Sequence, residues 1–469
     1  MKRVIISLLA LGFAACAYCQ DSLQLQIFNR LQPIMARTFT PSYTDVALLH
    51  TPWLQSTTVE AKYDWRNENQ AEIQELGNGL SQGRFLANSL KHLGQGRAVE
   101  GSVSYLRGVK KNVYMNTSSD WELLQPYVMA DTVGGNLQTE QYTFAGRYAG
   151  RIGSWEYGLY GSYRALHEYR QTDPRPRNIS SDLGVRASAG RSLGSHSISV
   201  SVAYRRYHQL QAVSFMNPRG ANTSEFHLTG LGTHYARLAG SGSFTNLRFR
   251  GKGFSVAALF LPKAANGFST GLQYDWFKST RHLPNQNEVP YSELLTQTAS
   301  AFAAYRKVLD KFSYGAVLSL EYELREGSEA ILPSIISSGV EDIPYLTLYR
   351  SKLPQARLEG VLQLRAGKAV WSLEPMVAAY SSEARRLDSG KKAKTDDVSY
   401  GLTAGWTAML GKATTQLKIY AGKRALSLSA LAHFPAGRMS AFIRPSAGYH
   451  TWGSGLHGWT GNIGAGIEF

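Results

Sequence analysis

Cysteine is nearly absent from this sequence: Cys16 and Cys19 are the only two among 469 residues. Both fall in an N-terminal stretch that is expected to be removed on export. The mature chain is then expected to hold no disulfide, no thiol nucleophile and no cysteine-based metal site. Long apolar runs are also missing after Gln20, where none reaches the roughly 20 residues that a membrane-spanning helix requires. A helical membrane protein is thereby excluded.

The first residues have the pattern of a signal peptide. Lys2 and Arg3 precede an apolar run over residues 4–17, and small residues follow. Cleavage before Gln20 makes residues 1–19 the signal peptide. The alternative is a lipoprotein-type cut before Cys16, which would retain both cysteines. Either cut predicts export.

Signatures of catalysis are scarce as well. The run 267–271 matches the Gly-x-Ser-x-Gly pattern, but a strand-like segment follows it instead of the helix that a nucleophile elbow requires. Outer-membrane lipases are the enzyme alternative, yet His433 and His450, near predicted strand ends, have no local serine with a third orienting group. Two pairs of histidines, His227 with His234 and His450 with His457, are seven residues apart in loops, but no carboxylate pattern accompanies them, so chance explains the spacing better than a metal site. The sequence therefore predicts no enzyme activity, no cofactor and no metal site.

The charge is unbalanced, with 50 Lys and Arg against 34 Asp and Glu and a net charge of +16. Such an excess favours acidic partners. Export argues against nucleic acid, and no basic cluster is interleaved with aromatic residues in the manner of single-strand binders. Lipopolysaccharide phosphates and anionic solutes remain as expected partners.

What the sequence does contain is a repeated alternation of apolar and polar residues. From about Thr57 onward, apolar residues recur at every second position, and Ser, Thr, Gly, Glu and Arg occupy the positions between them. Long examples run over residues 312–324 and 398–410. A period of two is the signature of strands, because successive side chains point to opposite faces. The chain is therefore predicted to be all-β.

Connections of two lengths alternate between these segments. Long polar stretches, such as 326–354 and 383–397, are separated by short turns near 93–96, 151–154, 193–195, 263–266, 309–311, 366–369, 410–413 and 434–437. Short periplasmic turns and long extracellular loops are typical of transmembrane β-barrels, whereas a soluble sandwich has no reason to sort its loops by length. Two tight turns near Gly251 and Gly422 would lie outside. The count predicts a single antiparallel transmembrane β-barrel of roughly 16–20 strands over residues 56–469.

Residues 459–469 form an amphipathic strand at the end of the sequence. Its apolar face includes Trp459, Ile463, Ile467 and Phe469, and its other face is small or polar. The length suits a tilted bilayer crossing of roughly 9–11 residues, and the terminal aromatics suit interfacial girdles. A strand closing on phenylalanine resembles those of the outer-membrane β-barrel proteins of Gram-negative bacteria, in which it is read by the barrel-assembly machinery. The resemblance implies a cell outer membrane location, in contact with lipid and lipopolysaccharide.

This resemblance covers the whole mature chain. The length and the Tyr- and Gly-rich strands look like Bacteroidota-type outer-membrane proteins. More narrowly, the chain resembles a family of such barrels known only as a domain of unknown function. The resemblance implies a fold and a location but no activity.

The polar face of the predicted strands carries charge. If the apolar face meets lipid, the basic residues of the other face line the lumen: Arg147, Arg164, Arg186, Arg205, Arg357, Arg365, Lys418 and Arg444. Glutamates share that face, so two interpretations stay open. The basic residues either line a wet pore that favours anions or brace neighbouring strands within a plugged, rigid interior.

Residues 20–55 precede the regular pattern. Their loosely helical spacing, interrupted by prolines, favours a periplasmic tail or a short first strand, and the alternative is a small segment folded into the lumen. The sequence predicts a porin-like passive or gated passage for small polar solutes, and the basic residues of the inward face predict that these solutes are anionic. The alternative is a non-conducting accessory barrel whose loops bind lipopolysaccharide, a surface lipoprotein or a partner transporter. Uptake of hydrophobic substrates would need an apolar interior, which the polar face contradicts.

Overall fold

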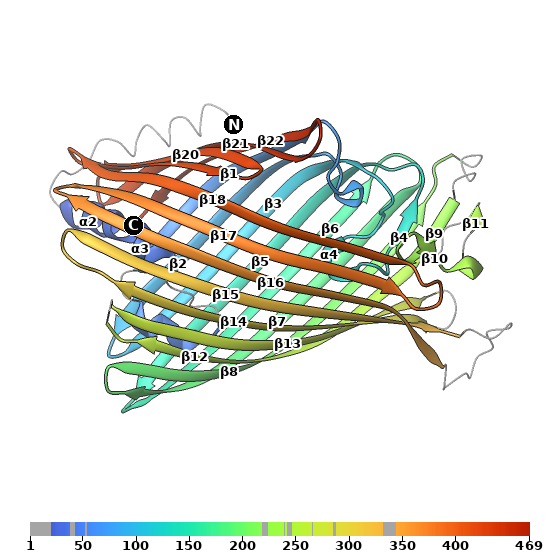
Figure 1. The fold of residues 1–469 in the computed structure, drawn as a ribbon, viewed down its shortest axis with the longest axis horizontal. Coiled ribbons are helices and arrows are strands. Elements are labelled where there is room, and N and C mark those ends of the chain that lie inside the picture. The colour runs from blue at the N-terminus through green and yellow to red at the C-terminus, as the bar shows by residue number, and fades with distance from the viewer. Residues whose placement is uncertain are drawn as a thin grey trace.

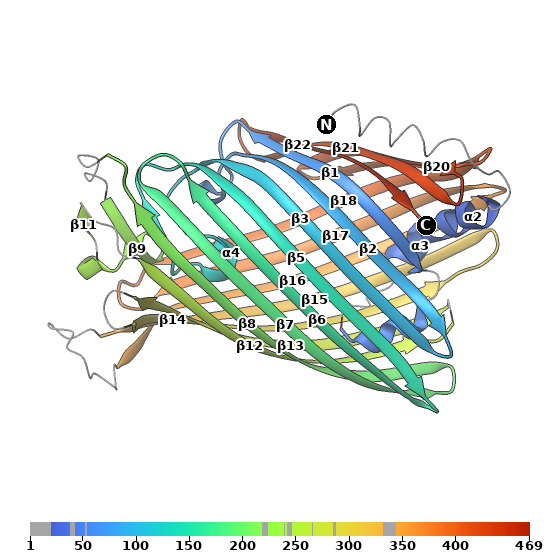
Figure 2. The ribbon, with the colours of Figure 1, turned by 180° about the vertical axis from the view of Figure 1, so that it is seen from behind.

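The chain forms one closed barrel of antiparallel strands. The structure, a computed structural model, describes residues 20–37, 43–51, 54–217, 224–238, 240–241, 246–264, 266–284, 288–331 and 344–469. Within these ranges, 18 strands form a single sheet, which closes because β1 pairs with both β2 and β22. Figure 1 and Figure 2 show the strands tilted around a long axis. The predicted fold class is confirmed, and the strand number lies within the predicted range.

The barrel strands follow one another around the wall in chain order. Their bounds are β1 (Ser56–Glu68), β2 (Gly79–Gly94), β3 (Arg97–Val113), β5 (Gly135–Ile152), β6 (Trp155–Arg170), β7 (Arg175–Leu193), β8 (His196–Ser214), β12 (Leu247–Pro262), β13 (Gly267–Leu283), β14 (Val289–Lys307), β15 (Phe312–Ala330), β16 (Tyr345–Ala366), β17 (Ala369–Arg386), β18 (Lys392–Leu410), β19 (Ala413–Gly422), β20 (Ala425–Ala436), β21 (Met439–Gly453) and β22 (Leu456–Glu468).

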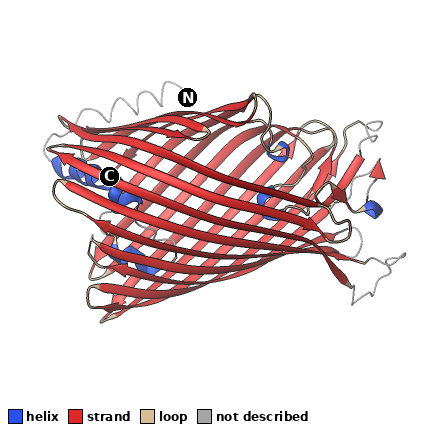
Figure 3. Cartoon of the chain, viewed as in Figure 1, coloured by secondary structure: helices blue, strands red, loops and turns tan. Residues whose placement is uncertain are grey.

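Short elements occupy the N-terminal segment and the connections, as Figure 3 shows in blue for the helices. The N-terminal segment contains α2 (Gln20–Arg30), α3 (Pro33–Arg37) and the 3-10 helix η1 (Asp45–His50). The connections contain η3 (Gln74–Leu76), α4 (Trp121–Leu124), β4 (Met129–Asp131), β9 (Ser224–Gly230), β10 (Thr233–His234), η4 (Ala236–Leu238) and β11 (Gly240–Ser241). No helix among the described residues is long and apolar enough to cross a membrane.

The eight short turns predicted to be periplasmic all lie at one end of the barrel, the end that also holds α2 (Figure 1). Glycines with positive φ make several of them tight, for instance Gly153 at 61° and Gly194 at 53°. The turn after Gly422 lies at the opposite end, as predicted, but the turn predicted at Gly251 is wrong. Gly251 lies inside β12 and pairs with both β8 and β13.

Many of the polar stretches predicted as long loops are paired strands. The stretch 383–397, for example, consists of the end of β17, a short turn and the start of β18. The strands extend well past the roughly 9–11 residues needed to cross a bilayer, and β16 has 22 residues. Beyond the lipid both faces of a strand meet water, so the apolar alternation that marks strands in the sequence disappears there.

The apolar face of each strand points outward. Leu159, Val202, Leu272 and Tyr400 are each more than half exposed, at 59, 60, 61 and 57%. Large apolar side chains exposed over an entire wall suit a lipid environment and not water. The outer surface is therefore that of an outer-membrane-type β-barrel.

The wall is uneven in height on one side. β19 has 10 residues, whereas its neighbour β18 has 19. The ladder between them ends at the pair of Gly401 and Gly422, and beyond the hydrogen bond from Lys423 N–H to the carbonyl oxygen of Tyr400, residues 392–399 of β18 pair only with β17. This stretch of β18 is a free strand edge at the outer rim.

Candidate functional site: a lumen closed at both ends

The N-terminal segment folds against the inner wall at the end with the short turns. It is neither the tail nor the first strand that its spacing favoured, because β1 begins at Ser56 and the short helices α2, α3 and η1 lie inside the barrel (Figure 1). α2 contacts β18 to β21, α3 contacts β15 and β16, and η1 contacts β3, β5, β6, β7 and β12. The segment therefore spans the lumen from one wall to the other. We call residues 20–37 and 43–50 the inner closure.

Asp45 anchors this closure and is completely buried. Its carboxylate accepts two hydrogen bonds from the guanidinium of Arg186, at 2.9 and 2.6 Å, and one from Ser188 at 2.9 Å. The backbone N–H of Asp45 in turn donates to the Ser188 hydroxyl at 3.0 Å. A paired, bidentate geometry is what makes a buried carboxylate tolerable. Asp45 therefore fixes η1 to β7.

A second buried contact holds the end of η1. His50 Nε2 lies 3.0 Å from the carboxylate of Glu156 on β6. The same carboxylate accepts hydrogen bonds from Ser192 and Ser197 on the next two strands, at 2.7 and 2.6 Å, and from Arg151. Apolar contacts add to these, since Tyr43 and Ala47 pack with Phe302 in a buried cluster.

Helix α2 is held to the opposite wall by polar contacts. Gln24 donates to Ser440 at 2.9 Å and accepts from Thr414 at 2.9 Å. Arg30 donates to Glu468 at 2.6 Å. Beneath them, the side chains of Ile27 and Phe28 are at most 1% exposed. The inner closure is thus seated on both sides of the lumen.

The other end of the lumen is closed by the connection between β3 and β5 and by β9 with its neighbours. We call residues 114–134 and 224–241 the outer closure. The carboxylate of Asp120 accepts hydrogen bonds from both terminal nitrogens of Arg164, at 2.7 and 2.8 Å, and from the hydroxyl of Tyr207 at 2.9 Å. Burial alone would raise the pKa of Asp120, but the hydrogen bonds from Arg164 and Tyr207 outweigh it and lower the pKa. Asp131 pairs with one terminal nitrogen of the buried Arg170, whose Nε donates to the carbonyl oxygen of Pro174 at 2.8 Å.

Arg281 of β13 joins the two parts of the outer closure and is 1% exposed. Its guanidinium lies 4.4 Å from the ring centre of Tyr291 and 5.3 Å from that of Tyr127. It also donates to Ser292 at 2.9 Å. Nearby, His227 lies between Glu225 and the Tyr291 hydroxyl, and burial together with the charge of Arg281 holds the pKa of His227 well below its usual range.

A chamber lined by ionic side chains lies between the two closures. The side chains of Arg205, Arg357 and Arg444 are 42, 48 and 46% exposed, although all three point inward. A cavity of about 300 Å³ lies beside β6, β7 and β8. It is bordered by Tyr160, Arg164, Asp182, Arg186 and Arg205. The middle of the barrel is therefore wet and polar while both of its ends are covered.

The structure places the eight basic residues predicted from parity on the inward face, and nearly all have an acidic partner. The ion pairs are Arg147 with Glu100, Arg164 with Asp120, Arg186 with Asp45, Arg205 with Asp182, Arg357 with Glu359, Lys418 with Glu374 and Arg444 with Glu60. Arg365 instead lies over the ring of Phe28 in the inner closure, at 5.5 Å. The lining is a mosaic of both signs.

Residues at the C-terminal strand face outward, away from this site. Trp459, Ile463 and Phe469 are 51, 51 and 49% exposed, and Ile467 is half-buried. The ring of Trp459 packs against Tyr449 with centroids 4.9 Å apart. These four residues belong to the lipid-facing wall.

Sequence reasoning missed the acidic anchors. Asp45 and Asp120 lie outside the alternating segments, so parity could not assign them to a face. Arg281 sits at the end of β13, where the alternation has faded. The available signal was the position of two aspartates in segments rich in small polar residues.

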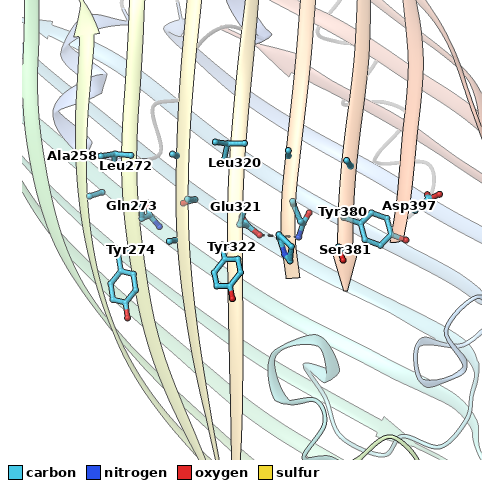
Figure 4. Close-up of a pocket in the computed structure, with 18 of the residues that line it drawn as sticks. Ala258, Leu272, Gln273, Tyr274, Leu320, Glu321, Tyr322, Tyr380, Ser381 and Asp397 are labelled. Carbon is cyan, nitrogen blue, oxygen red and sulfur yellow. Dashed lines mark hydrogen bonds between the residues drawn. The ribbon is translucent and has the colours of Figure 1, made fainter. Parts of the chain in front are cut away.

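A larger hollow lies on the outer wall across β12 to β18, with a volume of about 1270 Å³. Most of its lining belongs to the outward face, including Leu272, Tyr274, Leu320 and Tyr322, and Figure 4 shows the two tyrosines pointing the same way. Small residues such as Ala299 and Ala356 form its floor. Such a surface suits the acyl chains of the bilayer, not a polar solute. Among the described residues, no three His, Cys, Asp or Glu side chains are arranged to hold a metal.

Comparison with solved structures finds barrels of low similarity. BauA, the ferric preacinetobactin receptor from Acinetobacter baumannii, aligns with a TM-score of 0.43 and 9% identity over 88% of this chain and 80% of that one. The copper transporter OprC gives 0.40 and 9% over 88% and 83%. CdiB from Acinetobacter baumannii gives 0.38 and 9%, and the match to 89% of this chain spans 60% of CdiB. Likeness of this order says nothing about what the chain binds.

The sequence comparisons give a family and no activity. No curated protein matches the chain. The pattern of a family of unknown function (DUF6850) matches residues 46–451, which include η1 after Asp45 and the barrel from β1 into β21. The chain belongs to this family of unknown function, DUF6850, and is an outer-membrane-type β-barrel.

Proposed function

We propose that this protein is a gated passage for small polar solutes through the outer membrane, closed in the conformation described above. One observation carries the proposal: a wet, ionic chamber lies behind a closure that is not part of the barrel wall. The inner closure precedes β1, so its displacement would break no strand pair. Its anchors, such as Asp45 with Arg186, are polar contacts that water can replace.

The preference for anions remains a prediction. Counting basic residues on the inward face favours anions, but pairing with acidic side chains cancels much of that field. Selectivity would then depend on which charges stay exposed in the open state. Arg357 and Arg444 are about half exposed and would contribute most.

The test is conductance of the purified protein in planar bilayers, compared with a variant lacking residues 20–50. We expect the full chain to conduct weakly and the variant to conduct at least tenfold more. Reversal potentials in a KCl gradient would then report the ion preference of the lumen. If a variant that also lacks residues 114–134 folds into a barrel, judged by circular dichroism, and still does not conduct, the passage proposal is wrong.

The second candidate is an accessory barrel with no passage. The closure of both ends favours it, and so does the ion pairing that braces neighbouring strands. In this role the excess of basic residues would bind lipopolysaccharide, a surface lipoprotein or a partner transporter. The deletion variant would stay non-conducting, while the full chain would retain lipopolysaccharide through purification.

A further inference from the structure

A separate cavity of about 410 Å³ lies within the outer closure. Its inner wall is formed by β15, β16 and β17, and its other sides by residues 121–128, the turn between β9 and β10, and the tip of the connection at residues 74–75. The volume falls in the range of roughly 300–1,000 Å³ that is usual for small-ligand sites. It lies just above the ionic chamber, because Glu323 is the next inward residue after Glu321 on β15.

The turn between β9 and β10 is fitted closely to the barrel wall. Gly230 has a φ of 101°, and a Cβ built there would lie 2.9 Å from the ring of Tyr349 and 3.0 Å from Pro126. Only glycine allows this approach. The shape of the cavity is thus set by a close backbone contact.

The charged groups that line the cavity satisfy one another. Arg325 donates from Nε to Glu323 at 2.8 Å and from Nη2 to the other oxygen of Glu323 at 3.4 Å. Its Nη1 donates to the carbonyl oxygens of Glu122 and Gln125, at 2.8 and 3.3 Å. All three guanidinium nitrogens and both carboxylate oxygens are engaged, so this pair offers no free charge to a ligand.

The third charged residue of the lining is equally poor as an ion site. Burial raises the pKa of Glu75, which disfavours its charged form, and Gln74 hydrogen-bonds to it. A charged ligand entering the cavity would lose its hydration without gaining an unpaired counter-charge.

The other polar side chains that line the cavity are neutral. The side chains of Gln125 and Ser382 line the cavity, and within the described part of the chain neither has a hydrogen-bond partner. The indole of Trp121 lines it too. An amide offers both donors and an acceptor, a hydroxyl offers one of each, and an aromatic ring offers a flat apolar face. This combination matches a molecule that has hydroxyl groups at its edge and C–H groups on its faces.

We propose that this cavity is a binding site for an uncharged, polyhydroxylated molecule of mono- to disaccharide size. Gln125 and Ser382 hydrogen-bond to its hydroxyl groups, and Trp121 supports a ring face. The proposal does not depend on conduction, since a barrel that passes nothing could still bind such a ligand at this closure.

The test is isothermal titration calorimetry of the full chain in detergent with maltose, lactose and cellobiose, and with glucuronate and glucosamine as charged counterparts. We expect at least one neutral disaccharide to bind saturably at one per chain, and the charged sugars to bind at least tenfold more weakly. Gln125→Ala and Ser382→Ala should each weaken binding about tenfold. Ser381→Ala is the matched control, because this neighbouring hydroxyl points to the outward face, and it should leave binding unchanged.

Three results would overturn the site. The first is that no neutral sugar of the panel binds, and the second is that glucuronate or glucosamine binds as tightly as the best disaccharide. The third is binding that neither Gln125→Ala nor Ser382→Ala changes. Ser382→Trp fills the cavity and should abolish binding, with circular dichroism showing that the barrel is retained.

Discussion

The two closures of the lumen differ in how they are attached to the barrel. The outer closure is tied to the wall by strands on either side, and Leu124, Val128 and Met129 belong to one buried apolar cluster with residues of β8, β12, β13, β14 and β15. The inner closure is joined to the wall only by its contacts and by the chain leading into β1. Its apolar contacts are divided between separate clusters, with ionic anchors between them. The comparison teaches that the inner closure can detach from the wall without breaking a strand pair, whereas the outer closure is held by strands at both of its ends.

The largest effect is expected from removing the anchor of the inner closure. Asp45→Ala leaves Arg186 without its bidentate partner, and breaking such a pair costs about 3 kcal/mol. Hydrogen exchange of residues 43–50 should speed up by roughly a hundredfold. Asp64→Asn is the matched control, since Asp64 also pairs inside the lumen, with Lys62, but does not touch the closure. Equal exchange in both variants would contradict the anchor.

A smaller effect is expected at the outer closure. Asp120→Asn removes the charge that Arg164 faces, at a cost of about 1–3 kcal/mol. The apolar cluster beside it should hold the connection in place, so proteolysis within residues 114–134 should not increase. Release of this connection would show that both closures are equally mobile and would remove the distinction between them.

Acid should loosen the outer closure through the same carboxylate. Because the pKa of Asp120 is lowered in the folded state, its stabilisation is present above the unfolded pKa and is lost as pH falls through the folded value. Fluorescence of the adjacent Trp121 should change in this acid range. The transition should be absent in Asp120→Asn, and its persistence there would assign it to another group.

The smallest effect is expected at α2. Arg30→Ala removes the hydrogen bond to Glu468 but leaves Ile27 and Phe28 buried, so a loss of about 1 kcal/mol is expected. Exchange should rise in residues 23–30 and not in residues 43–50. A coupled rise in both would mean that the inner closure moves as one body even under a slight perturbation.

The sequence predicted the barrel strands better than the segments that lie inside the lumen. Alternation is imposed wherever one face of a strand meets lipid, so in the segments that cross the membrane parity can assign residues such as Arg186 and Trp459 to a face. Outside that zone the constraint disappears, and Gly251 was wrongly read as a turn. The inner closure has no periodic constraint, since residues 43–50 form a short 3-10 helix whose fit depends on side chains more than a hundred residues away. Asp45 and Arg186 lie 141 residues apart in the sequence, and no local pattern predicts that they pair.

The short hairpin of β19 and β20 affects how neighbouring copies of the barrel can contact one another in the membrane. It leaves the backbone of residues 392–399 able to accept another strand, which would let neighbouring copies join edge to edge. Lys392, Lys394 and Asp396 lie along this stretch, and Lys394 pairs with Asp396 at 2.9 Å. Charged, hydrated side chains there discourage a second sheet from docking. The charged side chains therefore protect this stretch of the rim against edge-to-edge polymerisation.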